Sequence, residues 1–129
     1  MKIKKLFILL LVCVLSNNQV FSLGRKTEWE GYWNIKSQTN KSLFPNIPFR
    51  SEYFNNSIVI YNLEPDRMIT YEILDEYSNV LITGCVLKEN TAQITISISD
   101  LPDNGIYTII LTSPNPNDRV WSQFEKRMP

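Results

Sequence analysis

Strict alternation of apolar and polar side chains marks the segment from Gln93 to Asp100. The apolar positions are Ile94, Ile96 and Ile98, and the residues between them are threonine and serine. A period of two residues turns every second side chain to the same face of an extended strand. The segment therefore predicts a β-strand with one buried face and one solvent-facing face.

Similar runs recur along the chain, separated by turn-forming residues, and no segment after the first 22 residues has the period of a helix. We expect strands at residues 31–36, 47–54, 57–63, 68–75, 80–87, 92–99, 105–112 and 119–126. Residues 57–63 and 106–112 are apolar on both faces, which is typical of central strands. Residues 36–46 are irregular and are expected to cross along an edge. Seven or eight short antiparallel strands predict an all-β, immunoglobulin-like β-sandwich.

The first 22 residues have a different pattern. Lys2, Lys4 and Lys5 precede an unbroken apolar run from Leu6 to Leu15. This order is typical of a secretory signal peptide, and the apolar run is too short for a bilayer, which needs about 20 residues. We expect cleavage after residue 22, a single domain at residues 23–129 without a transmembrane segment, and export to the periplasm or the extracellular cell envelope.

The charge balance of residues 23–129 disfavours nucleic acid as a partner. Loss of the three N-terminal lysines leaves ten basic residues against thirteen acidic ones, a net charge of −3. Proteins that bind nucleic acid or anionic lipid usually present a basic face. Neither partner is expected for this chain.

The residue types disfavour an enzyme, a cofactor or a metal site. The chain has no histidine, the usual general base and zinc ligand, and its four glycines are far apart. Asp100, Asp103 and Asn104 could offer oxygens to calcium, but their spacing matches no calcium loop. Cys85 is the single cysteine after residue 22 and is expected to be a small buried residue, with an intermolecular disulfide or a reactive thiol as alternatives.

A turn at residues 103–107 predicts a structural device. Asp103, Gly105 and Tyr107 have the spacing of a tyrosine corner, in which the phenol bonds to backbone a few residues upstream. Gly105 is expected to supply a backbone conformation that a side chain would penalise. Ile109 stands where an antibody domain has its second cysteine. The similarity is therefore to the architecture and not to antibody domains.

Aromatic residues near the N-terminus of the domain are the candidate ligand-contact surface. They are Trp29, Tyr32, Trp33 and Phe44. Exposed aromatics on a β-surface often hold sugars or peptides. The alternative is that Tyr32 or Trp33 covers the core from an edge strand. Trp121, in the last predicted strand, is expected to pack in the core or at its rim.

Several of these features together resemble a known family. The matching motifs are Gly31-Tyr32-Trp33, Lys41-Ser42 followed by Pro45, the pair of strands between Pro48 and Tyr61, Leu101 with Gly105 and Tyr107, and Phe124 near the end. In this order, residues 29–127 resemble the short secreted proteins of Bacteroides and relatives that form a domain family of unknown function. The resemblance implies an immunoglobulin-like β-sandwich without catalytic residues.

The expected function is binding. We interpret the chain as an exported, non-enzymatic module that binds a protein or a glycan at the cell surface. The alternative is an inhibitor or accessory protein of a secreted hydrolase, of the type that blocks cysteine proteases by loop insertion. The sequence lacks the Asn-Pro-x-Thr-Gly loop of those inhibitors.

Overall fold

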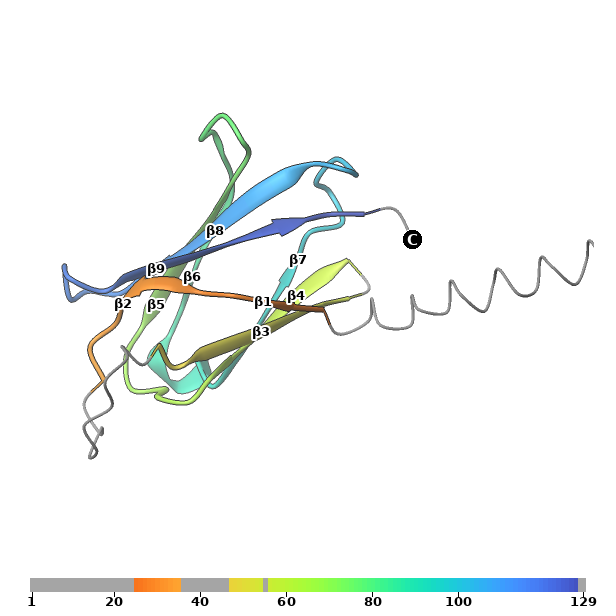
Figure 1. Ribbon diagram of the computed structural model, residues 1–129. Helices are drawn as coiled ribbons and strands as arrows, with labels where there is room; N and C mark the ends of the chain where they lie inside the picture. The colour runs from red at the N-terminus through yellow and green to blue at the C-terminus, as the bar shows by residue number, and fades with distance from the viewer. Residues whose placement is uncertain (1–24, 36–46, 55, 128–129) are drawn as a thin grey trace, which may run out of the picture.

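The computed structural model describes residues 25–35, 47–54 and 56–127 (Figure 1). The strands are β1 (Arg25–Thr27), β2 (Glu30–Tyr32), β3 (Phe49–Phe54), β4 (Ser57–Asn62), β5 (Ile69–Leu74), β6 (Val80–Val86), β7 (Gln93–Ser97), β8 (Ile106–Thr112) and β9 (Arg119–Glu125), and a short 3₁₀ turn, Lys88–Asn90, follows β6. Seven of the eight expected strands are present near their expected bounds. The strand expected at residues 31–36 is β2, which ends at Tyr32, and β1 is an addition. The expected signal peptide and the crossover at residues 36–46 lie outside the described residues.

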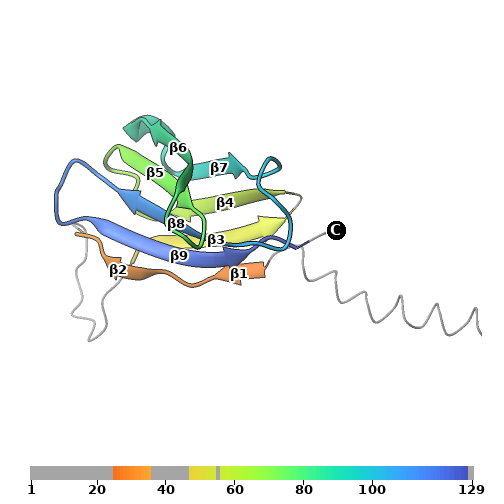
Figure 2. The same cartoon turned by 90° about the horizontal axis from the view of Figure 1, so that it is seen from above.

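The strands form two antiparallel sheets packed face to face (Figures 1 and 2). One sheet has the order β1-β3-β4-β7, and the other has the order β2-β9-β8-β5-β6. β4 and β8 lie inside their sheets, as their two apolar faces predict. The arrangement confirms the all-β sandwich. Within the described ranges, no helix is long and apolar enough to cross a bilayer.

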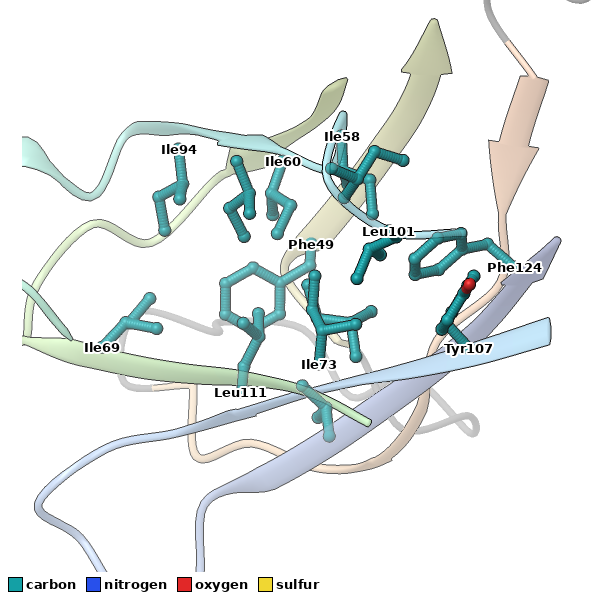
Figure 3. Packing of buried hydrophobic residues seen from close by; sticks show 14 of the residues in the cluster. Phe49, Ile58, Ile60, Ile69, Ile73, Ile94, Leu101, Tyr107, Leu111 and Phe124 are labelled. Atoms are coloured by element: carbon teal, nitrogen blue, oxygen red, sulfur yellow. The ribbon is translucent and has the colours of Figure 1, made fainter. Parts of the chain in front are cut away.

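Isoleucines from both sheets fill the space between them (Figure 3). Ile58 and Ile60 of β4 and Ile69 and Ile73 of β5 are 2% exposed or less. Burial of such a side chain stabilises the fold by roughly 1.5–3 kcal/mol. The described residues contain no disulfide, so this apolar packing is the main source of stability.

The turn after β7 is a tyrosine corner. Tyr107 is 3% exposed, and its hydroxyl donates to the carbonyl of Pro102 at 2.6 Å. Its ring centre is 5.5 Å from that of Phe124, beside it in Figure 3. Burial, with a smaller contribution from the charge of Asp103, raises the pKa of the Tyr107 phenol. The phenol therefore keeps its proton and acts as a donor.

Gly105 has a different role from the one expected. The positive φ in this turn, 64°, belongs to Asn104, and Gly105 is not among the positive-φ glycines. A Cβ at Gly105 would lie 2.5 Å from Oη and 2.8 Å from Cζ of Tyr107. Glycine is needed here because the phenol occupies the place of a side chain.

A buried lysine completes the corner. Lys126 is 3% exposed, and its ammonium donates to the carbonyls of Leu101 at 2.5 Å and Ser99 at 3.2 Å. Its Nζ is 3.3 Å from Oδ1 of Asp103. The end of the chain after β9 is thereby fixed to the loop between β7 and β8.

A second polar cluster closes the other end of the sandwich. The carboxylate of Asp118, which is 1% exposed, accepts hydrogen bonds from the N–H of Asn34, from Nη1 of Arg67 and from the hydroxyl of Ser113, at 2.6–2.9 Å. The guanidinium of Arg67 also lies 5.3 Å from the ring centre of Trp33. The chain after β2 is thereby fixed to the loop between β8 and β9.

Cys85 corrects another expectation. It is exposed on β6, the last strand of the five-stranded sheet. Its partner on β5 is Thr70, and Gly84 beside it faces inward under the ring of Tyr71. Side chains alternate between faces, so Cys85 lies on the outer face and not in the core.

The corner predicts a loss of stability in the variant Tyr107→Phe. Removal of the hydroxyl leaves the carbonyl of Pro102 without its donor and should lower the free energy of unfolding by about 0.5–1.5 kcal/mol. Urea denaturation measures the change. Tyr77→Phe is the matched control, because Tyr77 is 78% exposed. Equal stability of the two variants would contradict the corner bond.

Candidate functional site

The N-terminal segment of the domain changes from one sheet to the other. β1 pairs with β3 in the four-stranded sheet, and β2 pairs with β9 in the five-stranded sheet. Only Glu28 and Trp29 lie between them. Figure 2 shows β1 and β2 following one another along the same side of the sandwich. The segment therefore closes this side by pairing with each sheet in turn.

Contacts with both sheets hold Glu28 and Trp29 at the point where the chain passes from one sheet to the other. The half-buried indole of Trp29 donates from Nε1 to Oγ of Ser51 at 3.1 Å, and its ring centre is 5.8 Å from that of Phe49. From the other sheet, the hydroxyl of Ser122 donates to the carbonyl of Glu28 at 2.5 Å. The two connecting residues are thus held by β3 on one side and by β9 on the other.

Gly31 allows β2 to lie against β9. Its φ is 114°, a conformation that side chains rarely adopt. A Cβ at this position would be 2.8 Å from Cα of Val120 and closer still to the carbonyl oxygen of Arg119. Only glycine fits here without displacing backbone.

A groove lies where the chain passes from the four-stranded sheet to the five-stranded sheet. β2 reaches only the first half of β9, opposite residues 119–121. Beside residues 122–125 lies a groove of about 820 Å³. Its lining residues are Glu28, Glu30, Tyr53, Ile106, Thr108, Trp121, Ser122, Gln123, Phe124 and Glu125.

The groove combines an apolar surface with negative charge. Trp121 and Ile106 are large apolar side chains that remain 37% and 45% exposed. Glu28, Glu30 and Glu125 supply three carboxylates, and none of the lining residues that the structure describes is basic. Such a concave surface concentrates negative potential next to an aromatic face.

One cation touches the rim of the groove. Nη2 of Arg127 is 3.3 Å from Oε1 of Glu125, and both side chains are well exposed. An exposed pair of this kind contributes roughly 0–1 kcal/mol. The carboxylates of Glu28 and Glu30 are the groove's principal charges.

The reactive groups of the groove are carboxylates and hydroxyls. Its hydroxyls belong to Tyr53, Thr108 and Ser122, and the chain has no histidine to activate one. In the part of the chain that the structure describes, no three His, Cys, Asp or Glu side chains are placed to hold a metal ion.

Three of the four aromatic residues that the sequence suggested as a contact surface lie in the described part of the chain, and they differ in exposure. Trp33 is 3% exposed and packs edge-on against Phe49, with ring centres 4.9 Å apart, so it belongs to the core. Trp29 anchors the transfer between sheets. Tyr32 is 54% exposed on β2. Phe44 lies outside the described residues.

Trp121 is the aromatic residue that the sequence interpretation missed. On β9 the inward residues are Val120, Ser122 and Phe124, and their burial alternates with exposure of the residues between them. Trp121 occupies one of the alternate positions whose other residues, Arg119, Gln123 and Glu125, are polar. This position in the alternation indicates, from the sequence alone, that Trp121 faces outward.

Comparison with known proteins supports the architecture. No family model matches the sequence, and no curated protein matches it. The fold is similar to the crystal structure of a DUF3244 family protein with an immunoglobulin-like β-sandwich fold from Bacteroides vulgatus ATCC 8482. The TM-score is 0.66 at 24% sequence identity, over 81% of this chain and 99% of that chain. This confirms the immunoglobulin-like fold and the resemblance to the Bacteroides proteins of unknown function.

The transfer predicts that Gly31→Ala is more damaging than Gly84→Ala. At Gly31 the new Cβ meets backbone at a positive φ, and we expect a loss of about 2 kcal/mol or more in the free energy of unfolding. At Gly84 the obstacle is the far end of the Tyr71 side chain, which can move. Urea denaturation compares the two variants. A Gly31→Ala variant as stable as Gly84→Ala would refute this account of β2.

Proposed function

We propose that the chain is an exported, non-enzymatic immunoglobulin-like module that binds a protein at the cell envelope through the groove beside β9. The observation that carries the proposal is the groove itself, whose described lining residues include three glutamates and the 37% exposed Trp121 but no lysine or arginine. The absence of histidine from the chain favours binding over catalysis.

The chemistry of the groove favours a protein segment that carries lysine or arginine. A cation near Glu28 and Glu30 gains from both carboxylates, and a cation over the face of a tryptophan gains roughly 0.5–1 kcal/mol at an exposed site. The aliphatic stems of these side chains also cover apolar surface, and Ile106 offers such a surface. One ligand residue can therefore use the apolar and the charged parts of the groove together.

A glycan is the other ligand class that the sequence suggests. A sugar ring could stack on Trp121 and donate hydrogen bonds from its hydroxyls to the carboxylates, but a neutral sugar would leave the three negative charges unneutralised, whereas a cation would balance them. Glu28 and Glu30 therefore favour the basic protein segment. Inhibition of a secreted hydrolase stays a prediction of the sequence.

The test is binding of a short, labelled oligolysine peptide to the exported protein, measured by fluorescence anisotropy at several salt concentrations. We expect binding that weakens as ionic strength rises, because salt screens exposed charges. The double variant Glu28→Gln/Glu30→Gln should bind roughly three- to tenfold more weakly. Trp121→Ala should weaken binding roughly threefold.

Glu89→Gln is the matched control, because Glu89 is exposed in the turn after β6 and does not line the groove. A glycan array with the same protein tests the other ligand class. Glycan binding that is lost in Trp121→Ala would keep the groove and replace the ligand. Peptide binding that is equal in the groove variants and in the control would overturn the proposal.

A further inference from the structure

β6 is a free edge of the five-stranded sheet. Among the strands that the structure describes, it pairs with β5 alone, and it lies at the end of the sheet opposite β2 (Figure 2). From Val80 to Leu87 the sequence contains no charged residue and no proline. Those are the residue types that usually protect an exposed edge from pairing with another strand.

The direction of the backbone along this edge follows from the hairpin before it. The N–H of Asp75 donates to the carbonyl of Asn79 at 3.0 Å, so the backbone N–H of Asp75 points toward β6. The backbone groups of successive residues point alternately to the two neighbouring strands. The backbone groups of Tyr71, four residues earlier, therefore also point toward β6. Gly84 is opposite Tyr71 and therefore bonds with β5.

Thr83 and Cys85, on either side of Gly84, direct their N–H and C=O groups away from β5. Both residues are exposed. The bulge in the β5–β6 pair lies at Leu81 of β6, which has no partner between Ile73 and Leu74 of β5. The regular part of the edge therefore begins at Ile82. The free edge thus offers two regularly spaced pairs of donors and acceptors.

Apolar side chains flank this edge. Leu81 is 42% exposed and Leu87 is 55% exposed, at equal sequence distances on either side of Gly84. The other edges differ. β1 contains Arg25 and Lys26, and β7 turns polar side chains outward.

We propose that β6 pairs antiparallel with β6 of a second copy of this chain, around a two-fold axis at Gly84. In this register, Thr83 of each copy exchanges two backbone hydrogen bonds with the second copy's Cys85. Beyond these pairs, Leu87 of each copy extends along the edge toward the bulge at the second copy's Leu81. Gly84 meets its own equivalent at the close, non-hydrogen-bonded position, where the lack of a side chain allows the approach.

The strand's own sequence indicates a second copy as the occupant. A two-fold interface must complement itself, and a strand without charge meets its copy without repulsion. Thr83 and Cys85 lie in regular register on either side of Gly84, as pairing around a two-fold axis requires. The groove lies at the other end of the sheet, so the dimer presents two free grooves and gains affinity for a ligand with two basic segments.

The test is the oligomeric state of the full chain, purified in the form that the cell exports, by light scattering and sedimentation over a range of concentrations. We expect a dimer that persists in reducing agent and in Cys85→Ser, because the pairing uses backbone groups. Thr83→Lys places a charge beside the axis in both copies and should raise the dimer dissociation constant about tenfold or more. Thr95→Lys, on the exposed face of β7, is the matched control and should leave it unchanged.

A monomer at every concentration would overturn the proposal. So would a dimer that is lost in reducing agent, since it would depend on a disulfide of Cys85. Equal effects of Thr83→Lys and Thr95→Lys would also overturn it, because the contact would then not involve β6. Circular dichroism of both variants verifies that they keep the β-sheet fold.

Discussion

A strand segment can pair with only one sheet at a given residue, and the segment from β1 to β2 pairs with both sheets in turn. The transfer at Glu28 and Trp29 closes one side of the sandwich. Because of this crossing, residues 122–125 of β9 do not pair with β2. The groove lies beside these residues. The position of Trp29, held by Ser51 and Phe49, therefore determines both the closure of the core and the shape of the groove.

Buried polar groups hold the two ends of the sandwich around this transfer. Asp118 and Arg67 fix the chain after β2, and Lys126 fixes the chain after β9. A buried charge is costly unless it is paired and hydrogen-bonded. In both clusters the hydrogen bonds join segments that are far apart in sequence. The clusters therefore favour one arrangement of the loops, which the apolar core alone would not distinguish.

The alternation of side chains predicted the sandwich because each strand is long enough to show a period of two. Three-residue β1 is too short for that signal. Tyr107 was recognised from local spacing, whereas the role of Gly105 depends on where the phenol lies. The sequence left the faces of Trp33 and Trp121 open for one reason: the aromatic character of a residue does not say which face of the strand it occupies. The groove was beyond prediction because it depends on the point at which the chain leaves β9.

We propose that a basic ligand binds beside Trp121. The chain has three tryptophans, whose indole N–H groups give separate signals in a nitrogen–proton correlation spectrum. During titration with the oligolysine peptide, the account predicts a progressive shift of the Trp121 signal, while the signal of buried Trp33 stays in place. A titration that moves the Trp33 signal, or other parts of the spectrum, and leaves Trp121 unchanged would contradict the claim.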